Sequence, residues 1–255
     1  MADALLAANG VTVRFGGLVA LSEVDLEVAS TGVTGLIGPN GAGKTTLFNV
    51  ITGLQRPTHG AVQFAGGDIT RWSPNRRGRA GLSRTFQRLE LFGGMSVRDN
   101  LVAAWEAKTP GGVLGRGSVK GRALVDNVIA RLDLAGIADR RAGSLPTGLG
   151  RIVELGRAMC TQPRLLLLDE PSSGLDGAET TMFRDLLLEI TDPDRGGLAD
   201  GPVPAVLLVE HDVRLVMEVC GQITVLDFGR QIARGTPAEI QADPAVIAAY
   251  LGDAA

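Results

Sequence analysis

Apolar and polar residues alternate along the chain in two ways, one typical of strands and one typical of helices. Short apolar runs at 11–15 and 24–28, with Gly16-Gly17 after the first, predict antiparallel strands near the N-terminus. Four later runs are almost wholly apolar, as expected of strands buried on both faces of a parallel sheet: 33–37, 165–168, 206–209 and 223–226.

Helical spacing of apolar residues begins at Leu47 and continues to Leu54, directly after a glycine-rich stretch. Residues 109–122 contain five glycines and one proline and predict an exposed loop or insertion. Three helices are expected around that loop: one opened by Ser96 with Asp99 and ending near Ala107, one with its apolar face between Leu124 and Leu132, and one containing Ile152, Leu155 and Met159 that stops before Pro163.

These elements together predict an α/β fold in a single domain, 1–255, of ordinary size for one compact unit. We expect residues 1–89 and 163–255 to form a core with a mostly parallel sheet and an N-terminal antiparallel β subdomain. Residues 90–162 are expected to form an inserted α-helical subdomain.

Composition narrows the class of protein. Hydrophobic residues make up 45% and charged residues 21% of the chain, which excludes a disordered protein. Aromatic residues make up only 4% and the net charge is −3, both of which disfavour a nucleic-acid partner. The two cysteines form no C-x-x-C pair, so we expect free thiols. No apolar stretch is long enough to span a membrane and no secretory leader is evident, so we expect an intracellular protein.

Glycine is over-represented, with 35 residues where ordinary usage predicts roughly 18. Part of the surplus lies in a stretch that matches the phosphate-loop pattern G-x-x-x-x-G-K-[ST]: Gly38, Pro39, Asn40, Gly41, Ala42, Gly43, Lys44, Thr45. Glycines let backbone N–H groups surround phosphate oxygens, the lysine reaches the β- and γ-phosphates, and the Thr45 hydroxyl can bind Mg²⁺. Chance would give about 0.006 matches in a chain of this composition, so we predict nucleotide binding.

Asp169 and Glu170 follow the apolar run at 165–168. Ligands of parallel sheets bind at the carboxyl ends of the strands, where these two side chains should emerge. There Asp169 would assist Mg²⁺ binding and Glu170 would act as the base for the attacking water. Two surface acids at a strand end are the alternative, which the neighbouring phosphate loop disfavours.

Taken together, these motifs resemble the ATP-binding cassette (ABC) ATPases, a group of P-loop NTPases, over essentially the whole chain. Further motifs follow in that family's order: Phe15 before the phosphate loop, Gln87 in a Q-loop, a signature stretch at 145–149, a D-loop from Ser173 to Asp176, and the switch histidine His211. The resemblance implies that ATP and Mg²⁺ are the cofactors.

The resemblance also implies a role for each matching residue. Phe15 would stack on adenine, Thr46 would extend the phosphate loop, and Gln87 would contact Mg²⁺ and the γ-phosphate. His211 would hold the γ-phosphate together with Lys44. Gly148 of the signature and Asp176 of the D-loop would act across the interface of two cassettes that enclose two ATP molecules.

The signature departs from the family pattern Leu-Ser-Gly-Gly-Gln, because here it is Leu145-Pro146-Thr147-Gly148-Leu149. Pro146 supplies neither the hydroxyl nor the N–H of the usual serine, although it is well suited to begin a helix. We therefore hypothesise a heterodimer in which a different cassette supplies an intact signature to this chain's phosphate loop. Alternatively, the Thr147 hydroxyl substitutes for the missing one.

The C-terminal stretch 235–252 and the stretch 14–21 resemble the larger ATPase subunit of branched-chain amino-acid importers. The resemblance implies transmembrane permeases and a solute-binding protein as partners, and a location on the cytoplasmic face of the membrane. Lipopolysaccharide export, urea import and a non-transport ABC ATPase remain the alternatives. The basic run from Arg71 to Arg88 is interpreted first as a solvated face, and second as a surface near the membrane subunit or lipid headgroups.

Overall fold

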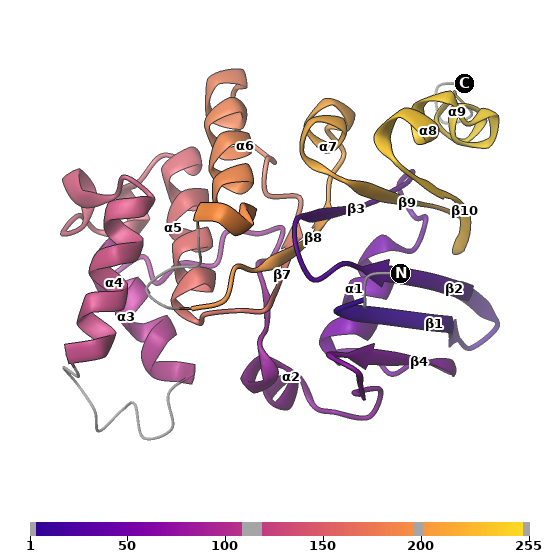
Figure 1. The fold of residues 1–255 in the computed structure, drawn as a ribbon, viewed down its shortest axis with the longest axis horizontal. Coiled ribbons are helices and arrows are strands. Elements are labelled where there is room, and N and C mark those ends of the chain that lie inside the picture. The colour runs from indigo at the N-terminus through magenta and orange to yellow at the C-terminus, as the bar shows by residue number, and fades with distance from the viewer. Residues whose placement is uncertain (1–3, 109–118, 196–200, 252–255) are drawn as a thin grey trace.

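The computed structural model describes residues 4–108, 119–195 and 201–251 of the chain. Two sheets form the described core (Figure 1). The first is antiparallel, in the order β2-β1-β4-β5. The second has the order β10-β9-β3-β8-β7-β6, with only β10 antiparallel to its neighbour. The strands are β1 (Leu6–Phe15), β2 (Leu18–Val28), β3 (Val33–Ile37), β4 (His59–Phe64), β5 (Gly67–Asp68), β6 (Leu82–Arg84), β7 (Leu165–Asp169), β8 (Ala205–Val209), β9 (Gln222–Asp227) and β10 (Arg230–Gly235).

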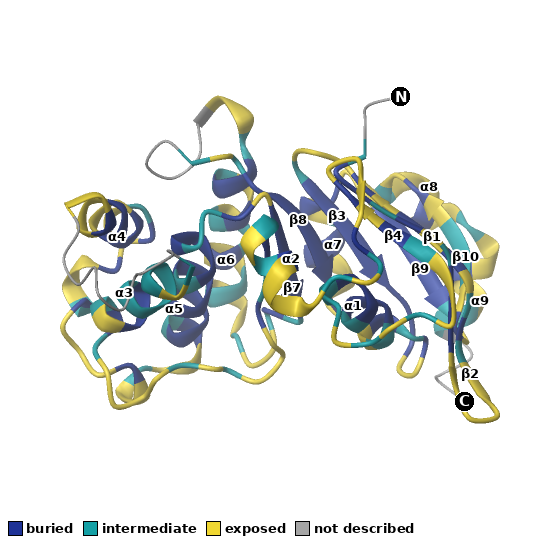
Figure 2. Cartoon of the chain, turned by 90° about the horizontal axis from the view of Figure 1, so that it is seen from below, coloured by how far each residue is buried: buried dark blue, intermediate teal, exposed yellow. Residues whose placement is uncertain are grey.

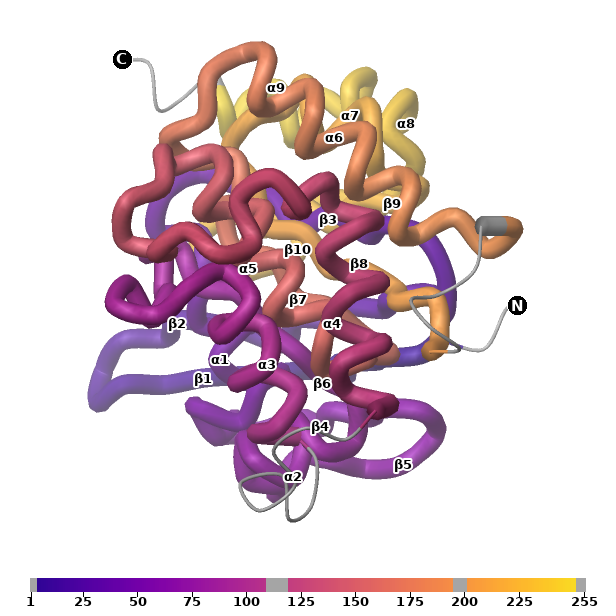
Figure 3. The backbone as a smooth tube through the Cα atoms, turned by 90° about the vertical axis from the view of Figure 1, so that its left-hand side faces the viewer, coloured from indigo at the N-terminus to yellow at the C-terminus, as the bar shows by residue number. Residues whose placement is uncertain are grey.

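The helices lie on the faces of the parallel sheet and at one end of it. They are α1 (Lys44–Thr52), α2 (Pro74–Ala80), α3 (Val97–Lys108), α4 (Val119–Arg131), α5 (Thr147–Cys160), α6 (Gly177–Thr191), α7 (Val213–Val219), α8 (Pro237–Ala242) and α9 (Pro244–Leu251). Helices α3, α4 and α5 are grouped at the end away from the antiparallel sheet, and Figure 3 views the molecule from that end.

Every residue of β3, β7 and β8 is buried, and successive side chains enter different cores. Leu166 and Leu168 of β7 belong to the core shared with α3 to α7, whereas Leu165 and Leu167 belong to the core shared with α1 and the antiparallel sheet. This period of two explains why the strands have no exposed face, and Figure 2 shows them as a buried layer. The four predicted apolar strands are confirmed to within one residue at each end.

Three expectations need correction. Helix α1 ends at Thr52 because Gly53 adopts a left-handed φ of 82°, so Leu54 is not on the helix and is exposed. The predicted loop at 109–122 is wrong for residues 119–122, which begin α4, with Gly121 packed against the Trp105 ring; residues 109–118 lie outside the described part.

The solvated-face interpretation of the basic run is wrong for Arg77 and Arg84. Arg77 is 1% exposed, and its Nη1 donates to the carbonyl oxygens of Val50 and Ile51 at 2.6 Å each. Those carbonyls end helix α1, so the buried guanidinium caps it. Burial lowers the pKa of Arg77 to about 10, which still leaves it charged at neutral pH.

The two cysteines, Cys160 and Cys220, are free and buried, as expected. No helix in the described residues is long and apolar enough to cross a membrane.

Candidate functional site

The predicted phosphate loop connects β3 to α1, and its glycines have conformations that other residues avoid. Gly38, Gly41 and Gly43 all have positive φ. A Cβ atom on Gly38 would lie 2.0 Å from the carbonyl oxygen of Leu226, and one on Gly43 would lie 2.7 Å from the Leu21 side chain. Glycine is therefore required for both backbone geometry and space.

Lys44 is buried at the first position of α1. Its Nζ donates to the carbonyl oxygens of Gly38 at 2.6 Å and Pro39 at 2.9 Å, which curves the loop around the ammonium group. Burial lowers the pKa of Lys44, while the charges of Glu170 and Asp169 oppose that shift. The loop therefore brings a positive charge to the end of β7, which bears both carboxylates.

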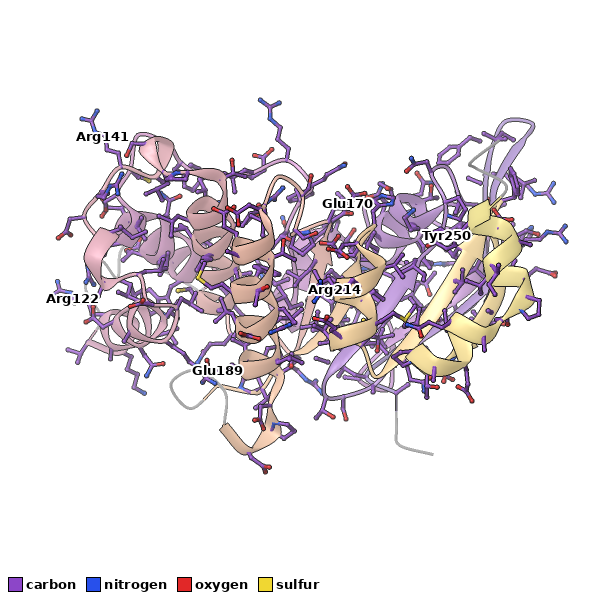
Figure 4. All side chains as sticks on the ribbon, turned by 90° about the horizontal axis from the view of Figure 1, so that it is seen from above. Arg122, Arg141, Glu170, Glu189, Arg214 and Tyr250 are labelled. Atoms are coloured by element: carbon purple, nitrogen blue, oxygen red, sulfur yellow. The ribbon has the colours of Figure 1, made fainter. Side chains whose placement is uncertain are left out.

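A cavity of about 420 Å³ lies beside this loop. Its lining joins the phosphate loop to residues from β2, from the ends of β7 and β8, and from the β9–β10 turn: Leu18, Val19, Ala20, Asn40, Gly41, Ala42, Gly43, Lys44, Thr45, Thr46, Glu170, His211, Phe228 and Gly229. Figure 4 shows Glu170 between the helical end and the half of the molecule that contains α8 and α9. The cavity thus brings together the predicted phosphate loop, base and switch histidine.

Glu170 is held by two other predicted site residues. Its Oε1 lies 2.8 Å from His211 Nε2, and its Oε2 accepts from Gln87 Nε2 at 2.7 Å. Its backbone has a φ of 49°, uncommon for a residue with a side chain, and its N–H donates to Val209. The Glu170 carboxylate is therefore bound by side chains from two segments that are distant from it in the sequence.

Asp169 makes a buried ion pair that the sequence analysis did not anticipate. Its Oδ2 accepts from Arg84 Nη2 at 2.7 Å, and both side chains are 8% exposed. Arg84 Nη1 also donates to Asn49 Oδ1 of α1, and the guanidinium lies near the rings of Phe48 and Phe86. The only signal in the sequence was the position of Arg84, three residues before Gln87.

The backbone of the Gln87 segment is anchored to the signature helix α5. Buried Arg151 donates to the carbonyl oxygen of Phe86 at 3.1 Å and also to that of Gln87. Its partner Glu154, whose pKa is raised by burial, accepts from Arg151 at 2.9 Å. A movement of α5 would therefore be transmitted to Gln87.

Thr45, Gln87 and Asp169 offer hydroxyl, amide and carboxylate oxygens, the hard donors that Mg²⁺ prefers. The described residues contain no group of three His, Cys, Asp or Glu side chains that could hold a metal ion. This donor set therefore fits a magnesium ion that enters with nucleotide phosphates and water rather than one held by protein alone.

Phe15, Asp176 and Gly148 do not line the cavity. Phe15 is half exposed at the end of β1. Asp176 is the N-cap of α6, where it accepts from the Glu179 backbone at 2.8 Å. A Cβ on Gly148 would lie 2.2 Å from Glu179 Oε1, so the signature packs on the start of α6 within the same chain.

Pro146 is the N-cap of α5, which begins at Thr147 as expected. No side-chain hydrogen bond caps this helix end, because proline has no side-chain acceptor. The signature end is thus intact as a helix but lacks polar groups at this position.

Two further residues near the phosphate loop were missed. Phe228 is 88% exposed, has a φ of 42° and lines the cavity; an aromatic residue before Gly229 in an aromatic-poor chain was its only signal. Burial raises the pKa of Tyr250 in α9, and a hydrogen bond with the Gly38 backbone opposes the shift. Figure 4 labels Tyr250. Nothing in the sequence indicated that the C-terminal helix reaches the phosphate loop.

Comparison with known proteins agrees with this geometry. The family model described as ABC transporter matches residues 21–173, and the model described as branched-chain amino acid ATP-binding cassette transporter matches residues 230–255. The chain is 38% identical over 264 residues to the high-affinity branched-chain amino acid transport ATP-binding protein LivG of Salmonella typhimurium, and 37% identical over 265 residues to BraF of Pseudomonas aeruginosa, with all of both chains covered in each case. The lipopolysaccharide export protein LptB of Acidithiobacillus ferridurans is 33% identical over 249 residues, covering 98% of this chain and 97% of LptB.

Solved structures show the same fold. A nucleotide-free ATP-binding cassette from an ABC transporter has a TM-score of 0.82 and 30% identity, covering 97% of this chain and 99% of that one. The ADP conformation of the cassette MJ1267 has the same TM-score and identity, covering 98% and 99%. The chain belongs to the ABC transporter family, as an ATP-hydrolysing, ATP-binding protein of the branched-chain amino acid transport type.

Proposed function

We propose that this chain hydrolyses ATP at the cavity beside Lys44 and thereby drives import of branched-chain amino acids through a membrane permease. The observation that supports the proposal most strongly is the Glu170 carboxylate, held by His211 and Gln87 at the cavity that the phosphate loop lines. A base aimed at this position can act on a water beside the γ-phosphate.

In the proposed reaction, Glu170 accepts a proton from water as the water oxygen bonds to the γ-phosphorus. The bond from that phosphorus to the β–γ bridging oxygen breaks, giving ADP and inorganic phosphate. Lys44 exchanges its bonds to the Gly38 and Pro39 carbonyls for the β- and γ-phosphates, and His211 holds a γ-phosphate oxygen. Phe15 stacks on adenine.

Magnesium, when bound, would neutralise charge on the β- and γ-phosphates. Thr45, Gln87 and Asp169 are the residues that would hold it. Asp169 keeps one oxygen on Arg84, which orients the carboxylate before the ion arrives.

We infer that the working unit is a heterodimer with a second cassette ATPase. Pro146 cannot donate an N–H or a hydroxyl to a phosphate across the dimer, so an intact signature on the partner would complete this chain's site. Asp176 is exposed at the start of α6, on the surface proposed for that contact, whereas Gly148 is buried against Glu179. Permease subunits and a solute-binding protein complete the system at the cytoplasmic face of the membrane.

Branched-chain amino acids are proposed as the cargo because the relatives named for their transport cover the whole chain. Lipopolysaccharide export is the second candidate, supported by LptB at lower identity. In both proposals the ATPase subunit does not contact the cargo. Only a transport assay can therefore distinguish amino-acid import from lipopolysaccharide export.

The test is leucine uptake into proteoliposomes that contain the complete transporter, with ATP inside or outside. Glu170→Gln should lower both uptake and ATP hydrolysis by about 100-fold or more, since it removes the base. Glu218→Gln is the matched control, because Glu218 is an exposed carboxylate on α7 paired with Arg184 and Arg214. ATP hydrolysis that persists in Glu170→Gln would contradict the assigned base, and hydrolysis without leucine uptake would contradict the cargo.

A further inference from the structure

Glu210, the residue between β8 and the switch histidine, is a buried carboxylate without an assigned role. It is 3% exposed, and burial raises its pKa. Among the ion pairs of the described residues, none gives it a Lys or Arg partner. A buried carboxylate without a cation is costly, so its contacts need an explanation.

The two oxygens of Glu210 bind different loops. Oε1 accepts from the Ser172 backbone N–H at 2.7 Å, and Oε2 accepts from the His211 backbone N–H at 3.1 Å. Ser172 follows Glu170 by two residues and leads toward α6, whereas His211 follows β8. One side chain therefore bridges the segment that bears the base and the segment that bears the histidine.

The turn after Glu170 has few other ties to the β8 loop. The Glu170 N–H donates to Val209 at 2.9 Å, and the Ser173 N–H donates back to Glu170 at 3.1 Å. The first bond fixes the start of the turn and the second closes it, but neither holds Ser172 beside His211. Glu210 supplies that link.

A carboxylate suits this position better than an amide. The backbone N–H groups of Ser172, His211 and Asp212 and the Ser172 hydroxyl all bond to Glu210, so both of its oxygens accept, as an ionised carboxylate can. A glutamine would turn an NH₂ group toward one of these N–H donors and leave that donor without an acceptor. The buried charge of Glu210 is therefore explained by the need for two hydrogen-bond acceptors at this position.

We propose that Glu210 is a positioning residue that sets the separation of Glu170 and His211, by clamping the turn after the base to the backbone of the histidine. The 2.8 Å contact between Glu170 Oε1 and His211 Nε2 is the distance that this clamp maintains. The inference rests on the proposed function, in which these two side chains act on one γ-phosphate.

The first test is Glu210→Gln in the complete transporter, with Glu218→Gln as the control. We expect kcat for ATP to fall about 10-fold, as for a lost positioning contact, with KM changed less than about twofold. Combining Glu210→Gln with His211→Ala should lower kcat no further than His211→Ala does, because both act through one group. An unchanged kcat, or fully additive losses, would overturn the proposal.

The second test does not depend on catalysis. The chain has only two histidines, His59 and His211, so their imidazole signals can be followed by NMR in the purified chain. Glu210→Gln should shift the chemical shifts of the His211 imidazole, while those of exposed His59 stay unchanged. An unchanged His211 signal in folded protein would refute the clamp.

If Glu210→Gln does not fold, Glu210→Asp takes both tests, since aspartate keeps the charge but is too short to reach both donors. Glu170→Gln is measured in parallel. Full activity in Glu170→Gln would overturn the proposed base. The positioning role of Glu210 would then be decided by the NMR signal of His211 alone. Loss of activity in Glu170→Gln with normal kcat in Glu210→Gln overturns only the positioning role.

Discussion

The phosphate-loop side of this chain, around Lys44 and Glu170, matches the ABC family pattern, whereas the signature side, residues 145–149, departs from it. On the first, Glu170 contacts His211 at 2.8 Å and Gln87 at 2.7 Å. Lys44 lies in the same site and donates to the Gly38 carbonyl oxygen at 2.6 Å. On the second, Pro146 stands at the N-cap where the family pattern has serine. In the proposed heterodimer, this chain would therefore have a complete phosphate-loop site and an incomplete signature for its partner.

This difference indicates that the two sides are under separate constraints. In the proposed dimer, the phosphate-loop side would serve this chain's own ATP, whereas the signature would serve the ATP of the opposite cassette. A defect in the signature would thus leave this chain's site fully active when its partner has an intact one. Helix α5 links the two sides, since Arg151 of the signature helix holds the carbonyls of Phe86 and Gln87.

The largest effect is expected from Gly38→Ala. Its Cβ would meet the Leu226 carbonyl oxygen at 2.0 Å on a residue with φ of 150°, so the loop must move away from its phosphate-binding shape. We expect ATP affinity to fall by about 100-fold or more, as for loss of a preorganised phosphate site. Titration with a fluorescent ATP analogue measures it.

Gly41→Ala is the control for Gly38→Ala. Gly41 also has positive φ, but its Cβ would meet nothing within 4 Å. Only backbone strain of about 1 kcal/mol should then lower affinity. Equal losses in the two variants would show that strain, rather than the contact with Leu226, shapes the loop.

The ion pairs of the two regions should differ in their contribution to folding. Arg84→Met removes the hydrogen-bonded ion-pair partner of buried Asp169, which should lower the free energy of unfolding by about 3 kcal/mol. Arg98→Met in α3 removes an exposed pair with Asp126 and should cost below about 1 kcal/mol. Urea unfolding of the purified chain compares them, and similar losses would contradict the buried role of Arg84.

Features encoded by a short stretch of sequence could be predicted, whereas contacts between distant segments could not. The apolar strands, the phosphate loop and the residues Glu170 and His211 were predictable, because each depends on a short run or motif. The bonds from Arg77 to α1 and from Arg84 to Asp169 join segments 26 and 85 positions apart. A charge count over 71–88 could not distinguish those internal arginines from solvated ones.

The same limit applies to the caps and to the C-terminus. Gly53 ended α1 although Leu54 continued the apolar period, because backbone conformation outweighed periodicity there. Tyr250 reaches the Gly38 backbone only through the packing of α9 beside β10, which no local pattern encodes.

Restoring serine at position 146 tests whether the signature limits the activity of the partner's site. Pro146→Ser returns a hydroxyl and an N–H to the partner's site, and should raise ATP hydrolysis of the assembled pair up to about twofold, because a second competent site is added. Thr147→Ala serves as the companion variant. If the Thr147 hydroxyl already substitutes, Thr147→Ala lowers the rate and Pro146→Ser leaves it unchanged.

The two thiols give the smallest expected effect. Burial raises the pKa of both Cys160, at the end of α5, and Cys220, beside Gly35 of β3, to about 12. The folded thiols therefore stay protonated through pH 9, and labelling requires local opening. ATP should slow labelling of Cys220 about threefold more than that of Cys160 in the single-cysteine variants, since it binds nearer β3. Equal protection at both thiols would mean that the two regions open together.

The central claim is that this chain's own phosphate-loop site is the stronger of two unequal sites. The most direct measurement is ATP hydrolysis by the assembled pair, comparing Glu170→Gln in this chain with the corresponding change in the partner cassette. We predict that Glu170→Gln abolishes most of the hydrolysis while the partner's change removes a minor share. Equal losses from the two substitutions would contradict the asymmetry.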